Sequence, residues 1–171
     1  MPDEHSTDAT DTTTNLASDT DTDTEITRLQ ALLLSVVSPW VRALDLTVLA
    51  LRPGEVDLAL PITPLHVHGG GVLCGQTLMA AADTAMVLAV SHQLGGFRPM
   101  TTVQLQTSFL RPIPGNGTAA GTNAEGSHNA SSAKVVARVL RAGKSLVFGE
   151  VEILDPAGRL AAHCTTTYAL L

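Results

Sequence analysis

The sequence predicts an α+β domain in which one buried helix precedes an antiparallel sheet. Residues 75–92 are apolar on nearly every side and rich in Ala and Met, which is typical of a helix buried against its neighbours. After this segment, runs of strand-forming residues alternate with turns. Apolar residues make up 44% of the 171 positions and aromatic residues only 3%, so the core must be built from Leu, Val, Ala and Met.

The N-terminal segment differs in composition from the rest. Residues 1–25 are low-complexity Asp, Ser and Thr sequence with little apolar surface to bury, so we expect a disordered acidic tail. This tail holds eight of the sixteen acidic residues and no Lys or Arg. Residues 26–171, expected to form a single domain, carry ten basic and eight acidic side chains, a balance of +2. The domain therefore does not repel an anionic ligand.

The elements before the buried helix are predicted from periodicity and turn residues. Apolar residues at helical spacing run through 25–37 and stop before Pro39. Two strands are expected over 40–51 and 55–60, joined by a Pro-Gly turn. Residues 61–71 contain two His and three consecutive glycines, and we expect them to form a loop.

The elements after the helix are predicted to be strands. A Gly-Gly pair ends the helix, and residues 113–132, which are small and polar, are expected to form a mobile loop insertion. The predicted strands are 101–111, 133–141, 145–154 and 160–170. Because short turns join the last three, this part should be an antiparallel meander.

Asp83 is the one Asp, Glu, Lys or Arg between Asp57 and Arg98, and it lies inside the apolar helix. A carboxylate in such a place is costly to desolvate, and either a raised pKa or a dedicated partner relieves that cost. A lone acid of this kind is a candidate general base or nucleophile. The alternative is that Asp83 lies on a thin solvent-exposed stripe of an otherwise buried helix.

Two motifs carry a family resemblance. The first is Gly75-Gln-Thr-Leu-Met-Ala-Ala-Ala-Asp-Thr-Ala-Met86, and the second is Thr101-Thr-Val-Gln-Leu-Gln-Thr-Ser-Phe-Leu-Arg-Pro112. In this order they resemble the PaaI-like hotdog-fold acyl-CoA thioesterases, over roughly residues 40–171. The resemblance implies an antiparallel sheet wrapped around one long central helix, assembled as a dimer or a dimer of dimers. It also implies hydrolysis of acyl-CoA to free acid and coenzyme A without a cofactor.

The resemblance assigns roles residue by residue. Asp83 would be the general base or nucleophile, and the Gly75 amide would be the oxyanion donor. Thr102 stands where relatives carry a Ser or Thr that holds the attacking water. His68 stands where the family has a carbonyl-orienting Asn or Gln, and Cys74 where it has a His. These two departures indicate a subgroup of the family.

The spacing of the two catalytic groups has a consequence for assembly. Gly75 and Asp83 are eight residues apart, which is about 12 Å along a helix. A carbonyl under attack must lie within about 3–3.5 Å of the nucleophile with its oxygen in reach of the N–H donor. One helix cannot present both groups to one substrate, so we expect the site to be shared across a two-fold homodimer.

The remaining site predictions concern substrate binding. Gln76 is expected to contact the acyl group, because it lies on the same helix face as the acid. The resemblance suggests Arg111 and the turn containing Arg141, Gly143 and Lys144 as anchors for the coenzyme A phosphates. A solvated strand face with alternating charge is the alternative for these cations.

Several other classes are disfavoured. His66 and His68 with Asp83 lack a clear third ligand, so we predict no metal site. Phosphate-loop, dinucleotide and nucleic-acid signatures are absent, and no run approaches the roughly 18–20 apolar residues needed to span a membrane. Two cysteines form no disulfide framework and the N-terminus is unlike a signal peptide, so a cytoplasmic location is expected.

Two other functions remain open from the sequence. A hotdog hydratase or dehydratase acting on an acyl thioester needs a His close to its acid, and only His68 is available for that role. A non-catalytic acyl-CoA binding module is disfavoured by the joint presence of Asp83, Gly75 and Thr102. The nature of the acyl group cannot be read from the sequence.

Overall fold

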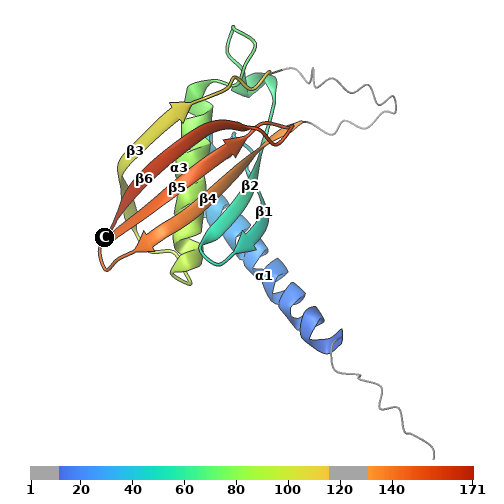
Figure 1. The fold of residues 1–171 in the computed structure, drawn as a ribbon. Helices are drawn as coiled ribbons and strands as arrows, with labels where there is room; N and C mark the ends of the chain where they lie inside the picture. The colour runs from blue at the N-terminus through green and yellow to red at the C-terminus, as the bar shows by residue number, and fades with distance from the viewer. Residues whose placement is uncertain (1–11, 116–130) are drawn as a thin grey trace, which may run out of the picture.

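A single six-stranded antiparallel sheet curves around one long helix, α3 (Gly75–Gln93), in a computed structural model that describes residues 12–115 and 131–171 (Figure 1). The strands are β1 (Thr47–Arg52), β2 (Glu55–Pro61), β3 (Met100–Phe109), β4 (Ser132–Ala142), β5 (Leu146–Leu154) and β6 (Leu160–Leu170). Their order across the sheet is β1-β2-β4-β5-β6-β3. This arrangement confirms the α+β class and the hotdog architecture expected from the sequence.

The helix is buried because its side chains face the concave side of the sheet. Alternate residues of each strand point toward it, as in β5, where Val147, Val151 and Ile153 are fully buried. Gly149 lies in the same row, and a Cβ placed there would be 2.2 Å from Met86 Cε. A glycine is therefore needed for α3 to approach β5 this closely. The core contains small and aliphatic residues, as the composition predicted.

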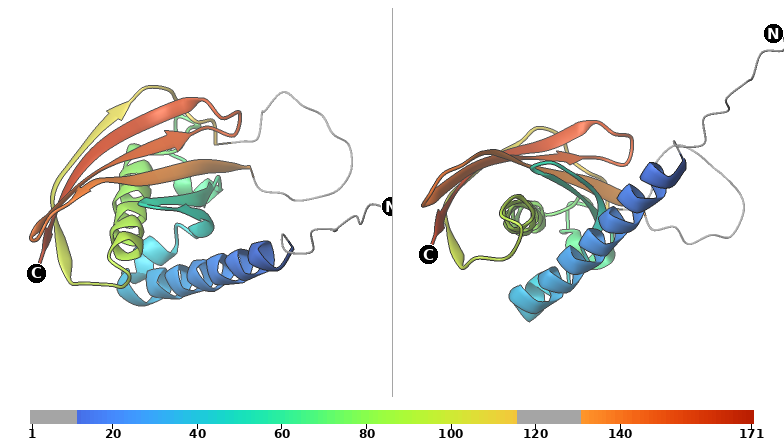
Figure 2. Two further views of the ribbon diagram at one scale, coloured as in Figure 1. Left: turned by 60° about the horizontal axis from the view of Figure 1, so that its bottom comes forward. Right: turned by 90° about the horizontal axis from the view of Figure 1, so that it is seen from below.

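The N-terminal helix is longer than expected. Helix α1 (Thr12–Val36) includes most of the segment predicted to be a disordered tail over 1–25, so that prediction is wrong for residues 12–25. Residues 1–11 lie outside the described part of the chain. The second half of α1 packs against the domain through buried Leu29 and Leu33, while its first half extends away from the domain (Figure 2). Docking of the apolar half supports a helix that continues upstream into polar sequence.

Glu25 fixes the middle of α1 to the end of α3. Its carboxylate pairs with Arg28 at 2.6 Å and with His92 Nδ1 at 3.0 Å. The hydrogen bond from the Arg28 guanidinium lowers the pKa of the Glu25 carboxyl to about 2, and His92 adds to the effect. The sequence did not predict this contact, because the two helices are far apart along the chain.

The region before the sheet also differs from expectation. The strand predicted over 40–51 begins only at Thr47, because Pro39–Arg42 forms a short helix, α2, with proline at its first position. A one-turn 3-10 helix, η1 (Pro64–His66), lies in the loop after β2. The other strands begin and end within two residues of their predicted bounds. Most of the loop insertion predicted over 113–132 falls on residues 116–130, which lie outside the described residues.

One edge strand of the sheet is covered by another part of the described chain, and the other edge strand is not. At the β1 edge, the Gln30 side chain of α1 donates to Leu46 O at 3.0 Å and accepts from Val48 N at 2.8 Å. At the other edge, β3 pairs with β6 alone among the described residues. Most of β3 is exposed, including Val103 and Phe109. The sheet therefore has one edge covered by its own chain and one edge open.

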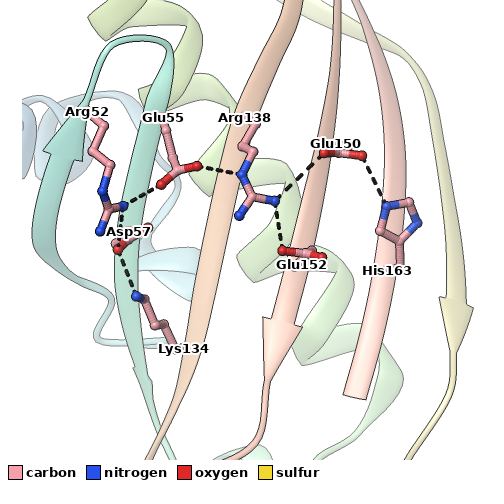
Figure 3. Close-up of polar contacts among 8 residues, drawn as sticks. All are labelled: Arg52, Glu55, Asp57, Lys134, Arg138, Glu150, Glu152 and His163. Carbon is pink, nitrogen blue, oxygen red and sulfur yellow. Dashed lines mark hydrogen bonds and ion pairs between the residues drawn. The ribbon is translucent and has the colours of Figure 1, made fainter. Parts of the chain in front are cut away.

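The convex face of the sheet carries a network of ion pairs instead of an apolar layer (Figure 3). Asp57 on β2 is only 1% exposed and is held by Lys134 at 2.8 Å and Arg52 at 3.1 Å. Arg138 on β4 joins neighbouring strands; its partners are Glu55, Glu150 and Glu152. The hydrogen bonds that Arg138 donates to Glu152 and Glu55 raise its pKa. Together the pairs connect β1 through β6 across the face opposite α3.

We expect Glu25→Gln to lower the free energy of unfolding by about 1 kcal/mol at neutral pH, because it removes the charge that pairs with Arg28 and His92. The native pKa of Glu25 is about 2 against an ordinary value of 4.5, so this contribution is full above about pH 4.5 and is lost as the pH falls toward 2. Urea unfolding of both proteins from pH 7 to pH 3 measures it. The exposed Asp21→Asn on the same helix is the control, and equal effects of the two variants would contradict the docking role.

Candidate active site

The start of α3 presents a free backbone amide. Cys74 is the N-cap residue in extended conformation and makes no side-chain cap; its Sγ lies 2.9 Å from Thr77 Oγ1. The Cys74 N–H donates to His66 O at 2.9 Å, which fixes the direction in which the helix begins. Gly75 is the first helical residue, so its N–H lies outside the intrahelical hydrogen bonds and at the positive end of the helix dipole. This amide can donate a hydrogen bond to a negatively charged ligand oxygen.

A cavity of about 380 Å³ opens at this helix start. Its lining residues are Val72, Leu73, Gly75, Leu78, Phe109, Leu110, Arg111, Pro112 and Ile113. A Cβ on residue 75 would lie 3.0 Å from Phe109 Cζ, so a glycine here keeps the space between the helix and the ring open. The walls are largely apolar, and Arg111 is the one charged residue among them. The cavity therefore combines an apolar surface, an amide donor and a guanidinium.

Asp83 lies two turns further along α3, half-buried on the side of the helix that faces β3 and β6. Its Oδ1 accepts a hydrogen bond of 2.8 Å from Thr102 Oγ1, and it also accepts one from the Tyr168 hydroxyl. The same hydroxyl lies 2.9 Å from the Asp83 carbonyl oxygen. Burial, together with the negative charge of Asp83, raises the pKa of Tyr168, so the phenol stays protonated as a donor. Asp83 thus has the dedicated partners that a carboxylate in an apolar helix requires.

Tyr168 was missed by the sequence analysis, whereas the proximity of Thr102 to Asp83 was implied by the family resemblance. The available signal for Tyr168 was that it is the single tyrosine of the chain and lies at an inward position of the last strand. That signal is insufficient because nothing in the sequence tells which strand lies beside the acid. The pairing of β6 with β3 brings Thr102 and Tyr168 opposite each other.

The acid and the helix-start amide do not share a cavity within one chain. Neither Asp83 nor Thr102 is among the residues that line the cavity at Gly75. Eight residues of α3 separate the two groups, which is about 12 Å along the helix axis. Strand β3 runs beside both groups, with Thr102 near the acid and Phe109 near the amide.

The two histidines of the loop play different parts. His68 is exposed, and its Nδ1 accepts a hydrogen bond from Gly70 N at 2.9 Å. His66 is buried, with its ring nitrogens 2.7 Å from Pro61 O and 3.2 Å from Ala43 O. Neither ring is hydrogen-bonded to Asp83 within the described residues. Across residues 12–115 and 131–171, no cluster of three or more His, Cys, Asp or Glu side chains could hold a metal ion.

The candidate phosphate anchors are not gathered at one place within the chain. Arg111 N–H donates to Ala161 O, near the start of β6, whereas Leu170 N at the end of β6 donates to Ser145 O in the β4–β5 turn. Nine residues of an extended strand separate these points, about 30 Å. Of the predicted anchors, Gly143 and Lys144 belong to that turn, and Arg141 lies beside it at the end of β4. Within one subunit, Arg111 and this turn are therefore too far apart to bind the same end of a ligand.

Gln76 borders a second cavity, of about 280 Å³, on the other side of the helix start. Its lining residues are Trp40, Ala43, Leu44, Leu65, His66, Gln76 and Thr77. The walls are mostly apolar, and α2, η1 and the first turn of α3 contribute them. Gln76 thus follows Gly75 along the helix and lines this apolar cavity.

Comparison with known proteins agrees with this architecture. Residues 66–119, which include the loop glycines, α3 and β3, match the thioesterase superfamily. A candidate esterase of Thermoplasma volcanium is 27% identical over 128 residues, covering 70% of this chain and 78% of that protein. A candidate esterase of Saccharolobus solfataricus is 27% identical over 129 residues, covering 75% of this chain and 80% of that protein.

Solved structures share the fold over most of the chain. A mutant of the phenylacetic acid degradation protein PaaI from Thermus thermophilus is 26% identical with a TM-score of 0.61, covering 78% of this chain and 100% of that chain. The E. coli PaaI protein is 18% identical with a TM-score of 0.67, covering 86% and 94%. A thioesterase from Haemophilus influenzae is 17% identical with a TM-score of 0.68, covering 84% and 90%.

These matches bear on the class of protein. No helix within the described residues is long and apolar enough to cross a membrane. The superfamily match spans the segment that carries the free amide of Gly75, the held carboxylate of Asp83 and the hydroxyl of Thr102. Over residues 66–119 the chain is accordingly similar to the thioesterase superfamily, and it shares the hotdog fold of the PaaI proteins; these similarities support a hydrolase.

Proposed function

We propose that the protein hydrolyses acyl-CoA thioesters to a free acid and coenzyme A, in a site that two subunits share. The observation that carries the proposal is that one helix carries two groups: a half-buried carboxylate, Asp83, which hydroxyl groups of β3 and β6 hold, and a first residue, Gly75, which lines a cavity. A base and an oxyanion donor are the two groups that thioester hydrolysis needs.

The open edge of β3 supports a two-fold arrangement. Antiparallel pairing of two β3 strands would run the Thr102 end of one subunit alongside the partner's Phe109 end. The acid of one chain would then approach the cavity at the partner's helix start. Exposed Val103 and Phe109 on β3 would be covered in the same step.

The chemistry follows from these groups. Asp83 takes a proton from water while the water oxygen attacks the thioester carbonyl carbon. The carbonyl oxygen becomes an oxyanion and is stabilised by the partner's Gly75 amide at the positive end of its helix. When the carbon–oxygen double bond re-forms, the carbon–sulfur bond breaks and the sulfur leaves with its electron pair. The proton on Asp83 then returns to the products, which are an acid and a thiol.

The same carboxylate supports a second route with equal stoichiometry. Asp83 attacks the carbonyl carbon directly, the thiolate leaves, and water then hydrolyses the mixed anhydride. In both routes Thr102 remains beside the reacting water, because a hydroxyl that donates to Asp83 can still accept a hydrogen bond from that water.

Substrate binding would use both subunits as well. The acyl group would occupy the apolar cavity beside Gln76, and Arg111 would bind a phosphate of coenzyme A. Arg111, Arg141 and Lys144 are exposed and make no ion pair in the described part of the chain. Lys134 and Arg138, by contrast, are occupied by carboxylates on the convex face. The two-fold arrangement brings the partner's Arg141 and Lys144 toward the end of the sheet that carries Arg111.

The alternative functions have less support. A hydratase or dehydratase would need a His beside Asp83, but His68 is exposed and bonded to Gly70 N. A non-catalytic binding module would not need a carboxylate held by two donors.

Turnover of a panel of acyl-CoA substrates of increasing chain length, with the free thiol measured, tests the proposed hydrolysis directly. Absence of thiol release from every member of the panel would contradict it.

We expect Asp83→Asn to keep the fold and lower thioester hydrolysis by about 10²–10⁴, the usual effect of removing a positioned base. The amide retains a carbonyl oxygen that can accept from Thr102 and Tyr168. Steady-state kinetics and thermal melting measure the two effects. The control is Asp45→Asn, an exposed aspartate with φ of 55°, a conformation that asparagine tolerates. Turnover by folded Asp83→Asn at the wild-type rate would remove Asp83 from the mechanism.

Mixing two inactive variants tests whether the site is shared. Gly75→Pro lacks the amide N–H and Asp83→Asn lacks the base, so each homodimer should be inactive. A mixed dimer would have one doubly damaged site and one intact site. Co-refolding at equal amounts should restore up to about a quarter of wild-type activity, since half the dimers are mixed and half their sites are intact.

The proline variant needs its own folding control. Proline is tolerated at the first helical position, but its Cβ would lie 3.0 Å from Phe109 Cζ. Circular dichroism and melting of Gly75→Pro alone establish that it folds. If folded dimers that are demonstrably mixed recover no activity, the shared-site arrangement is wrong.

A further inference from the structure

Asp83 uses its two carboxylate oxygens differently. Oδ1 accepts from both Thr102 Oγ1 and the Tyr168 hydroxyl, whereas no residue of the described structure donates to Oδ2. A carboxylate oxygen that already accepts two hydrogen bonds has little lone-pair capacity left. The oxygen without donors is the more basic and the more nucleophilic of the two. The reacting atom is therefore defined by where the two hydroxyls lie.

The two hydroxyls are not equivalent. Thr102 is exposed on the edge strand, so its hydroxyl can exchange its contact for water. Tyr168 is 1% exposed on β6, and its ring is packed beneath α3, so its hydroxyl cannot turn away to solvent. Of the two donors, Tyr168 is the one that holds its position whether or not substrate is bound.

We propose that Tyr168 is the positioning residue of the hydrolytic reaction, because its buried hydroxyl fixes Asp83 Oδ1 and leaves Oδ2 as the atom that reacts. This inference rests on the proposed thioesterase function. Tyr168 does not contact the substrate and acts through Asp83. In the general-base route Oδ2 takes the proton from water, and in the covalent route Oδ2 attacks the carbonyl carbon.

Two acceptors lie within reach of the single Tyr168 proton, namely Asp83 Oδ1 and the Asp83 carbonyl oxygen at 2.9 Å. While Asp83 is ionised, the carboxylate is the stronger acceptor and takes this proton. When Asp83 has taken up the proton of water, the hydroxyl can donate to the carbonyl oxygen instead. Tyr168 thus remains hydrogen-bonded through both protonation states of the carboxyl. Burial raises the pKa of Tyr168, which keeps its proton in place throughout.

The kinetic test uses Tyr168→Phe, which removes the hydroxyl and keeps the buried ring. We expect kcat to fall about 10–100-fold while KM stays within about twofold, because the carboxylate is misplaced but substrate contacts are kept. The matched control is Thr166→Val, two residues away on the same inward face of β6, whose buried Oγ1 has no hydrogen-bond partner in the described structure. Thr166→Val should retain both constants.

A spectroscopic test works without any activity. Tyr168 is the only tyrosine in the sequence, so a protein labelled with ¹³C at the tyrosine Cζ gives a single resonance. This resonance reports the hydrogen bond of the phenol, and we expect it to shift in Asp83→Asn and to stay unchanged in Asp45→Asn. If folded Asp83→Asn leaves the resonance where it is in the wild type, the Tyr168–Asp83 pair does not exist and the proposal is overturned.

The outcomes separate this inference from the function on which it rests. If the wild type hydrolyses no thioester but the resonance responds to Asp83→Asn, the proposed function fails and the pairing stands. If the wild type is active and folded Tyr168→Phe keeps kcat within about twofold, the positioning role fails and the function stands. If Tyr168→Phe does not fold, the resonance in wild type and Asp83→Asn decides the matter. A loss of kcat in Thr166→Val equal to that in Tyr168→Phe would also overturn the proposal, since any hydroxyl deletion on β6 would then act alike.

Discussion

The distance between the first residue of helix α3 and an acid in the middle of the same helix is the main constraint on this structure. Helix α3 carries a free amide at Gly75 and a held carboxylate at Asp83, about 12 Å apart on a rigid rod. No side-chain rotation closes that gap, because the amide belongs to the backbone and the carboxylate has only a short stem. A protein that needs both groups at one carbonyl must therefore take them from two helices. The same constraint explains why the β3 edge is open and why Arg111 and the β4–β5 turn lie at opposite ends of the sheet.

The sheet separates two kinds of chemistry on its two faces. Its concave face is largely apolar, and two of the polar side chains found there, Tyr168 and Thr102, hydrogen-bond to Asp83. Its convex face is held by ion pairs centred on Arg138 and the buried Asp57 (Figure 3). Charges that would be costly beside α3 therefore stabilise the sheet from outside. These pairs join β1, β2, β4 and β5, and the pair of Glu150 with His163 adds β6, the strand that carries Tyr168.

The sequence predicted the helices and strands well, but it did not predict which strands lie side by side. Helix α3 and strand β6 were predicted within a residue, because apolar periodicity and turn residues are local signals. The family resemblance identified Thr102 beside Asp83. Tyr168 was missed because it reaches the acid only through the pairing of β6 with β3. The upstream part of α1, residues 12–24, was missed because polar Thr and Asp residues form a helix only when the segment after them docks, and that docking uses Glu25 and the distant His92.

The uncovered edge of β3 has a meaning beyond catalysis. A row of unpaired backbone groups with Val103 and Phe109 exposed beside it is a template on which any other extended chain can add. The Gln30 side chain hydrogen-bonds to the backbone at the β1 edge, but no comparable side chain covers β3 in the described part of the chain. If a second copy fills that edge, the surface that completes the reaction centre is the same surface that keeps the protein from aggregating. Selection for solubility and selection for turnover would then act on the same ten residues of β3.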